Sequence, residues 1–261
     1  MPERTPPADQ EYIPSLEKGL AVIGLFSADA SALTLSQIAS KLKLTPGSAR
    51  RVLRTLEMLG YLTCEENRFS LTTRVLQLGF AYLSSQPIAK VMQPVLMEMA
   101  IKLHANCTVA VLDDTDVVYV ARATYRYTTR GRDYVALGSR FPAHATSPGK
   151  VLLSALSDEE LRRRFKDIPL ETFTPNTVAS LQELQAELAA VRSQGYAVND
   201  QQTFMGLRSL AIPLQIENRT IAALVTGSTV GQVTVAALIN DGLPVLREAA
   251  DRLAQLTAVL V

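Results

Sequence analysis

The 261-residue sequence has few residues of the kinds that hold metals or build disulfide frameworks. It contains two cysteines, Cys64 and Cys107, and two histidines, His104 and His144. The cysteines are too few and too far apart to indicate a disulfide framework, and the four residues show no metal-ligand spacing. We therefore expect reduced thiols, no metal site and no cofactor.

Sequence motifs of common enzyme classes are also missing. There is no G-x-S-x-G elbow, no Walker loop, no dinucleotide fingerprint and no zinc-binding histidine pair. Two histidines leave little for acid–base chemistry, and Ser147 has no identifiable base. We expect a protein that is not an enzyme.

Long apolar runs are absent as well. Runs such as Leu210–Leu214 and Ile221–Val225 are far shorter than the roughly 18 residues that suggest a membrane span. The start, Met1 to Arg4, has neither the charged beginning nor the apolar stretch of a secretory signal. With 48% hydrophobic and 20% charged residues, the chain can bury sizeable cores. We expect a globular, cytoplasmic protein that does not use a membrane.

The net charge of +1 hides an uneven distribution along the chain. Residues 34–74 contain seven basic residues and three acidic ones, a local charge of +4 that leaves −3 for the remainder. The basic residues are Lys41, Lys43, Arg50, Arg51, Arg54, Arg68 and Arg74. Such a division is typical of a small module that meets a polyanion while the rest of the chain has another role.

The first part of the chain predicts three helices followed by a hairpin. Residues 1–11 are polar and Pro-rich, which predicts a disordered tail. Ser15 is a candidate N-cap for a first helix, whose apolar face would be Leu16, Leu20, Ile23 and Phe26. Thr34 and Gln37 predict a capping box at the start of a second helix.

A third helix is predicted to follow a tight turn at Lys43-Leu44. Thr45 is its expected N-cap and Pro46 its first residue, and Gly60 ends it. Residues 61–64 and 68–71 then predict a hairpin of short strands. Three helices and a hairpin indicate a winged helix-turn-helix.

The polar face of the third helix is the candidate DNA-reading surface. At about 100° per residue, Gly47, Arg51 and Arg54 point away from the apolar stripe. Arginine can bond phosphates or the edges of guanine, and small residues let the helix approach the major groove. The predicted DNA contacts are Thr45, Gly47, Ser48, Arg50, Arg51, Arg54 and Arg68. The alternative is an ordinary solvated basic face.

The remainder of the chain mixes helices and strands without a regular βαβ alternation. Helical segments are expected from Thr73 to about Leu83 and over about 87–105, and capped helices at Ser157 and Ser180. Hairpins are predicted over 108–121 and 210–226, and a terminal helix from about Thr234, broken or bent at Gly242 and Pro244. This order predicts an α+β domain around a mostly antiparallel sheet. The expected organisation is a tail over 1–11, a winged domain over 12–72, a helical linker over 73–86 and a sensing domain over 87–261.

Two longer segments resemble the signature of one protein family. Residues 138–150 read G-S-R-F-P-A-H-A-T-S-P-G-K, and residues 195–213 contain G-Y-A-V-N-D and G-L-R-S-L-A-I-P. Both resemble the effector domain of IclR-type regulators, and residues 12–20 and the helix-turn-helix resemble the same family. The regulators of aromatic-acid catabolism, of the protocatechuate and β-ketoadipate pathways, are the most similar group. The resemblance implies a GAF-like sensor fold, homodimers that can pair into tetramers, and control of a catabolic operon.

The resemblance places Ser147 and Pro148 beside the bound effector. Residues 146–149 also read as a helix start, whose backbone N–H groups form a natural site for an anion such as a carboxylate. Alternatively, Ser147 only caps the helix. His144 is interpreted as a hydrogen-bonded residue that fixes a turn.

Further effector contacts implied by the resemblance are Asp200, Ser209, Val225 and Gly227. Leu207 is expected in the same pocket, because the predicted hairpin strands would place it in the wall with Ser209, Val225 and Gly227. The chain departs from its relatives at Gln201, Gln202 and Phe204, where acidic residues are common, and at Val225 and Gly227, where polar ones are. A less acidic, more apolar pocket favours an aromatic acid, and a small aliphatic acid is the alternative.

A second possible effector site is a segment that alternates basic and aromatic residues. It contains Arg122, Arg130 and Arg132 interleaved with Tyr125, Tyr127 and Tyr134. These could supply a cation and ring faces to an acid. A solvated loop explains them better, because exposed charged runs are common.

Taken together, these patterns predict a DNA-binding transcription regulator whose activity responds to a small organic acid. Its partners would be double-stranded operator DNA, the acid and a second copy of the chain. A ligand-binding enzyme or a sensor module without DNA binding are the alternatives from other classes. The missing catalytic motifs argue against an enzyme. The arginine face of the third helix and the wing argue against a sensor module that does not bind DNA.

Overall fold

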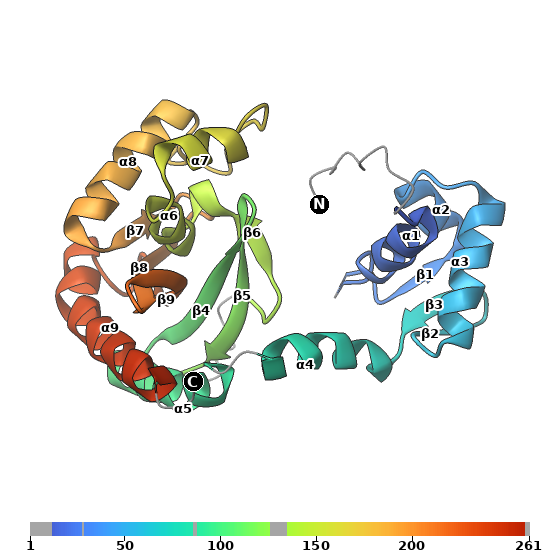
Figure 1. Ribbon diagram of the computed structural model, residues 1–261, viewed down its shortest axis with the longest axis horizontal. Coiled ribbons are helices and arrows are strands. Elements are labelled where there is room, and N and C mark those ends of the chain that lie inside the picture. Colours follow the sequence, from blue (N-terminus) through green and yellow to red (C-terminus); the bar gives the residue numbers. More distant parts are fainter. Residues whose placement is uncertain (1–11, 28, 86–87, 126–134, 259–261) are drawn as a thin grey trace. The chain divides into compact units, whose positions relative to one another are not determined.

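The computed structural model describes residues 12–27, 29–85, 88–125 and 135–258. Contacts divide the chain into two compact units, the first ending at Leu83 and the second beginning at Ser84 (Figure 1). The division falls inside α4 (Leu76–Ser85), which overlaps the segment expected to be a helical linker.

The first unit combines three helices with a small antiparallel sheet in the order β1-β3-β2. Its elements are α1 (Pro14–Ile23), β1 (Ala32–Thr34), α2 (Leu35–Lys41), α3 (Pro46–Met58), β2 (Leu62–Glu65), β3 (Arg68–Leu71) and the 3-10 turn η1 (Thr73–Val75). The β2–β3 hairpin directly follows α3, as it does in a winged helix-turn-helix. The predicted fold of this part is confirmed.

The signals that began α2 and α3 in the sequence act as expected. The Thr34 side chain accepts a hydrogen bond from the Gln37 N–H, and the Gln37 side chain accepts one from Thr34 in return. Thr45 accepts a bond from the Ser48 N–H, and Lys43 supplies the left-handed turn between the helices with φ 51°. These bonds fix α3 beneath a core formed by Val22, Leu33, Ile38, Leu53, Leu56 and Leu62.

The prediction for α1 was wrong in two respects. The helix begins at Pro14 with Ile13 at the N-cap position, so Ser15 lies inside it. The apolar face that was expected to pack in the core is also largely exposed to solvent, since Leu16 is 60% and Leu20 56% exposed. Val22 is the residue of α1 that the core buries completely. Strand β1 was not predicted because three residues are too few to show an alternation of apolar and polar side chains.

The second unit is built on a six-stranded sheet in the order β6-β5-β4-β9-β8-β7, in which every pairing is antiparallel. Its strands are β4 (Asn106–Asp113), β5 (Asp116–Ala123), β6 (Arg140–Pro142), β7 (Ala197–Asp200), β8 (Leu207–Ile216) and β9 (Arg219–Thr229). Its helices are α5 (Ala89–Leu103), α6 (Ser147–Ser154), α7 (Asp158–Arg164), α8 (Leu181–Gln194) and α9 (Val235–Ala258), with the 3-10 turn η2 (Ala143–Ala145) before α6. The α+β class is confirmed.

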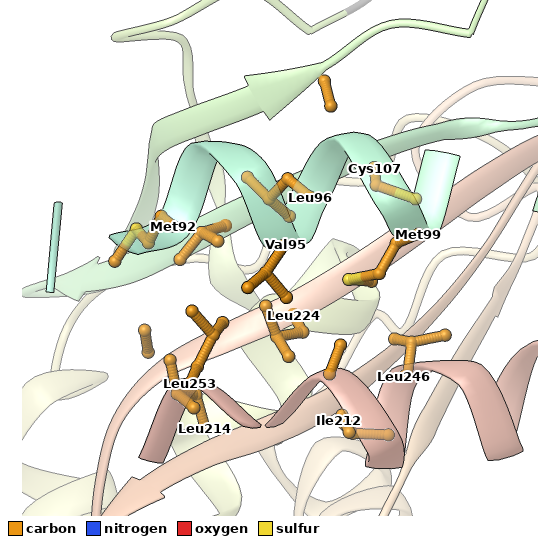
Figure 2. Close-up of a cluster of buried hydrophobic side chains, with 14 of the residues drawn as sticks. Met92, Val95, Leu96, Met99, Cys107, Ile212, Leu214, Leu224, Leu246 and Leu253 are labelled. Atoms are coloured by element: carbon orange, nitrogen blue, oxygen red, sulfur yellow. The ribbon is translucent and has the colours of Figure 1, made fainter. Parts of the chain in front are cut away.

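Helices cover both faces of this sheet (Figure 1). Helices α5 and α9 pack on one face. Figure 2 shows side chains of α5, such as Val95 and Met99, in one cluster with Leu246 and Leu253 of α9 and with Ile212, Leu214 and Leu224 of β8 and β9. Helices α6, α7 and α8 pack on the other face. Successive residues of β9 serve different cores, Leu224 the first and Val225 the second. Strands buried on both faces must be apolar throughout, which explains the continuous runs in the sequence.

The predicted hairpins of this unit are present and longer than expected, while the edge strands β6 and β7 were not predicted. The predicted N-caps Ser157 and Ser180 accept bonds from the N–H groups of Glu160 and Glu183. A break in the terminal helix was wrong, because α9 continues through Gly242 and Pro244. A Cβ at Gly242 would lie 3.1 Å from Leu210, so this glycine serves packing against β8.

Among the glycines that the structure describes, Gly149 makes the closest approach to another backbone segment, where η2 turns into α6. A Cβ at Gly149 would lie 2.0 Å from the carbonyl oxygen of Ala143 and 2.4 Å from its Cα. Both partners are backbone atoms of a fully buried segment, so neither can move aside. Gly149 therefore sets the position of the start of α6 against η2.

We expect Gly149→Ala to destabilise the second unit by about 3 kcal/mol or more, because the overlap can be relieved only by shifting backbone. Gly79→Ala is the matched control, since nothing lies within 4 Å of a Cβ there and alanine favours the helix. Chemical unfolding of the intact protein followed by circular dichroism measures both. A Gly149→Ala protein as stable as the parent would contradict this packing.

Candidate functional site

The polar face of α3 carries three exposed arginines. Arg50, Arg51 and Arg54 lie opposite Ala49, Leu53 and Leu56, which are buried. Within the described part of the chain, no carboxylate pairs with any of the three. Their guanidinium groups are therefore free to bind an external anion.

The other predicted DNA contacts surround this arginine face or lie on the wing. Thr45 and Gly47 are exposed at the start of α3, and a Cβ at Gly47 would meet nothing within 4 Å. Ser48 is half-buried in the same turn. Arg68 is exposed on β3, but it donates a 2.6 Å hydrogen bond to the Ala32 carbonyl. Arg68 therefore also braces β1.

The second unit contains a small cavity at the start of α6. It lies where β5, β6, the loop after β7 and the first residues of β8 meet. Its volume is about 20 Å³, room for about one water molecule. The residues lining it are Tyr119, Val135, Phe141, Thr146, Asn199, Thr203, Phe204, Leu207 and Ser209. None of these carries a charge, so the cavity is walled by rings, aliphatic groups, hydroxyls and one amide.

The structure brings several of the predicted effector residues together here. Leu207 and Ser209 line the cavity directly. Ser147, which is fully buried, shares a 2.7 Å hydrogen bond between its Oγ and the Oγ of Ser209. Pro148 is buried beside it in the first turn of α6.

Val225, Gly227 and Asp200 lie near the cavity but are not among its lining residues. Gly227 pairs directly with Ser209 across β8 and β9, so both residues face the same side of the sheet. Val225 is packed into the core under α6. The Asp200 carboxylate accepts a 2.6 Å bond from Arg208 Nε, so this candidate already has a cationic partner.

Thr146, and not Ser147, caps α6. The Thr146 side chain accepts a 3.1 Å bond from the Gly149 N–H, and its carbonyl accepts one from the Lys150 N–H. The alternative interpretation of Ser147 as the cap was therefore wrong. Pro148 has no N–H, so the helix start offers an anion the Ser147 N–H rather than a row of donors.

The loop after β7 is held against α6 by hydrogen bonds from buried polar groups. Asn199 Nδ2 donates to the Ala145 carbonyl at 2.7 Å and to Thr203 Oγ1 at 2.8 Å. Thr203 in turn donates to Ala145 at 2.6 Å, and Asn199 Oδ1 accepts from the Gln202 N–H. This network makes one wall of the cavity rigid. Sequence reasoning missed Asn199 and Thr203, although both lie inside the second signature segment.

Lys150 also stabilises this wall, from a buried position that does not face the cavity. Its side chain is 1% exposed, and its ammonium group contacts the Glu187 carboxylate on α8 and the Gln202 side chain. Burial lowers the pKa of Lys150, and the Glu187 contact opposes this. Lys150 therefore ties α6, α8 and the loop together and does not line the cavity.

Three side chains of the second unit that could act as nucleophiles or bases, those of Ser147, His144 and Cys107, are not arranged for catalysis. Ser147 bonds another hydroxyl, while His144 Nε2 lies 3.0 Å from the Glu171 carbonyl, consistent with a histidine that fixes a turn. Burial lowers the pKa of His144. Burial also raises the pKa of the Cys107 thiol to about 12, so the thiolate is scarce.

Two rings that sequence reasoning missed line the cavity with Phe204. Phe141 of β6 lies edge-on between Tyr119 of β5 and Phe204, with centroid distances of 6.0 and 5.8 Å. The alternation at the start of β5 could have placed Tyr119 inward, since Val117 and Tyr119 are both buried in the core beneath α6. Phe141 lies on an edge strand of three residues, too short for a pattern.

In the second possible effector site, Arg122 and Tyr125 contact other residues of the second unit. Arg122 donates to the Val135 carbonyl, and the Tyr125 ring packs edge-on against His104 at 4.9 Å. Tyr127, Arg130, Arg132 and Tyr134 lie outside the described residues.

Two further findings concern the part of the chain that the structure describes. No helix there is long and apolar enough to cross a membrane. No group of three or more His, Cys, Asp or Glu side chains there could hold a metal ion.

Comparisons with known proteins match both units. Residues 15–65 match the IclR helix-turn-helix domain, and residues 80–255 match the IclR C-terminal domain of bacterial transcriptional regulators. The chain is 37% identical to the Pca regulon regulatory protein of Pseudomonas putida over 239 aligned residues. The alignment covers 91% of this chain and 82% of that protein. The chain is 38% identical over 251 residues to the p-hydroxybenzoate hydroxylase transcriptional activator of Acinetobacter baylyi, covering 95% and 93%.

Solved structures share the fold. An IclR homologue from Microbacterium hydrocarbonoxydans, crystallised with 4-hydroxybenzoate, superposes with a TM-score of 0.79 at 23% identity, covering 94% of this chain and 99% of that one. The family matches span the arginine face and the cavity. The chain therefore belongs to the IclR family and is a DNA-binding transcriptional regulator, not an enzyme.

Proposed function

We propose that this regulator controls a catabolic operon in response to an aromatic carboxylate bound at the start of α6. The observation that carries the proposal is an uncharged cavity lined by aromatic rings beside the Ser147–Ser209 hydroxyl pair. We further propose that residues 12–72 bind DNA and residues 87–261 bind the effector. Residues 73–86 would form the helical linker between these two domains.

The hydroxyl pair offers a suitable anchor for a carboxylate. Each serine has one hydroxyl proton, and the single bond between Ser147 and Ser209 uses one of the two. The other proton and the Ser147 N–H can then donate to an anion, and the N-terminal end of α6 adds a favourable dipole. A buried carboxylate needs such donors, because leaving it unpaired is very costly.

The ring of the effector would contact the apolar part of the cavity. Tyr119, Phe141 and Leu207 supply ring faces and an aliphatic wall. An aliphatic acid of two or three carbons would leave these groups without contacts. The relatives whose names refer to p-hydroxybenzoate and the Pca regulon, and the homologue crystallised with 4-hydroxybenzoate, support the aromatic class.

We propose that the arginines of α3 contact the operator in the major groove. Replacing Arg51 or Arg54 with alanine should cost about 1–3 kcal/mol of operator affinity for a lost base contact, or lower the salt slope by about one for a lost phosphate contact. Arg162→Ala, on the exposed surface of α7, is the control. Fluorescence anisotropy over a salt series measures both quantities, and unchanged binding by both variants would remove this assignment.

The effector site is tested with two variants of different severity. Ser147→Ala should lose about 1–2 kcal/mol of affinity for 4-hydroxybenzoate, because it removes one donor to a charged group. Gly227→Phe should abolish binding, because its side chain would lie over Ser209, while the nearest atom to a Cβ there, 3.7 Å away, allows the backbone to stay in place.

Titration calorimetry measures these affinities, with Ser193→Ala on the exposed side of α8 as the control. Operator binding should be retained by all three variants. If Ser147→Ala and Gly227→Phe both bind like the parent, the effector site lies elsewhere.

We also propose that the chain acts as a dimer or as a tetramer formed by two dimers. One winged domain reads few bases, so two are expected to bind half-sites separated by whole turns of roughly 10 base pairs. Exposed apolar residues on α1 and on α4 of the first unit support this, since adjacent apolar side chains left on a surface favour association. They include Leu16, Leu20, Leu76 and Phe80, which are 56–71% exposed.

Sedimentation of the intact protein at micromolar concentration should give at least twice the chain mass of 28.4 kDa. Leu16→Glu combined with Leu20→Glu should weaken operator binding, because charge on this face opposes pairing of the winged domains. A monomer with and without DNA would contradict the proposal.

A further inference from the structure

The cavity is too small for the effector that its chemistry suits. It measures about 20 Å³, whereas a cavity that takes up a benzene ring is on the order of 150 Å³. Interiors are close-packed, so a ring can enter only if a side chain of comparable size leaves. The group that leaves must belong to the cavity wall.

Phe204 is the wall residue best placed to leave. It lies in the turn between β7 and β8, outside any strand, and its side chain is half-buried. The next residue, Met205, is 61% exposed, so solvent is adjacent. Tyr119 and Phe141, by contrast, lie on paired strands, and Tyr119 is 6% exposed.

The backbone around Phe204 is fixed even though the side chain faces solvent on one side. Thr203 is tied to Asn199 and Ala145 on one side of it. On the other side, the Leu207 N–H bonds the Phe204 carbonyl, and the Gly206 N–H bonds the Gln201 side chain. A rotation of the Phe204 side chain therefore needs no rearrangement of the loop.

We propose that Phe204 is an internal plug whose ring occupies the effector's ring position in the unliganded protein. Edge-on contact with Phe141 at 5.8 Å holds the ring there, as it would hold an aromatic ligand. Binding exchanges one ring for another, so the cavity keeps its contacts only when the incoming ligand is aromatic. This inference rests on the proposed effector site and identifies Phe204 as a determinant of its specificity.

The plug lowers the apparent affinity of the wild-type protein. A site that is open in only a fraction of molecules binds with its intrinsic affinity reduced by that fraction. Removing the Phe204 ring should therefore strengthen binding. If Phe204 were instead a wall that stacks on the ligand, its removal would weaken binding, so the two roles predict opposite signs.

The test compares Phe204→Ala with the wild-type protein and with the matched control Met205→Ala. The probes are phenol, which carries the ring without a carboxylate, and benzoate, and the measurement is titration calorimetry. Phe204→Ala should bind phenol at least tenfold more tightly than the wild-type protein does, and Met205→Ala should not. Equal or weaker phenol binding by Phe204→Ala would overturn the plug.

The benzoate titration separates this inference from the proposed function. If neither the wild-type protein nor Phe204→Ala binds benzoate while Phe204→Ala gains phenol binding, the proposed carboxylate site is wrong and the proposed role of Phe204 as a plug is supported. If the wild-type protein binds benzoate and Phe204→Ala binds both probes more weakly, the effector site stands and the plug is wrong.

A second variant reports the motion directly. The sequence has no tryptophan, so Phe204→Trp introduces a single such fluorophore. Saturation with benzoate or phenol should shift its emission to the red and increase quenching by acrylamide, because the indole moves into water. Emission that stays unchanged or shifts to the blue when ligand binds would overturn the plug.

Discussion

The effector-binding unit depends on the close approach of α6 to the turn that precedes it. Gly149 allows the backbone of α6 to pass against Ala143, where any larger residue would overlap it. That approach holds the turn where the Ala145 carbonyl accepts bonds from Asn199 and Thr203. The start of α6, the loop after β7 and the beginning of β8 are thereby fixed as one assembly, and the cavity is the space left between them.

Polar groups in this assembly serve two separate purposes. Asn199, Thr203 and Lys150 bond other protein groups and hold the wall, which leaves them little capacity for a ligand. Ser147 and Ser209 bond one another and retain a proton to donate. Because the charged groups are paired away from the cavity, an anion there would be recognised by neutral donors and by ring contacts. This suits a carboxylate attached to an aromatic ring.

Sequence patterns predicted the fold well where local signals were strong. Capping at Thr34 and Thr45, and the short continuous apolar runs of β8 and β9, identified their elements directly. Short edge strands such as β6 contain too few residues to show an alternation of apolar and polar side chains. The exposed apolar face of α1 could not be distinguished from a core-facing one, because an apolar surface that binds a partner has the same sequence pattern. For the proposed site, the signature segments pointed to Ser147, Leu207 and Ser209, two of which line the cavity while Ser147 bonds Ser209. The alternation of β5 could have indicated Tyr119, whereas Phe141 reaches the cavity through the pairing of a three-residue edge strand, which one sequence does not display.

The most direct test of this account is a crystal structure of the protein with 4-hydroxybenzoate. The account predicts a carboxylate within hydrogen-bonding distance of the Ser147 and Ser209 hydroxyls, with the ring against Phe141 and Leu207. The Phe204 side chain would be turned toward solvent. A carboxylate bound at any other place in the chain, such as beside Arg122, would contradict the central claim.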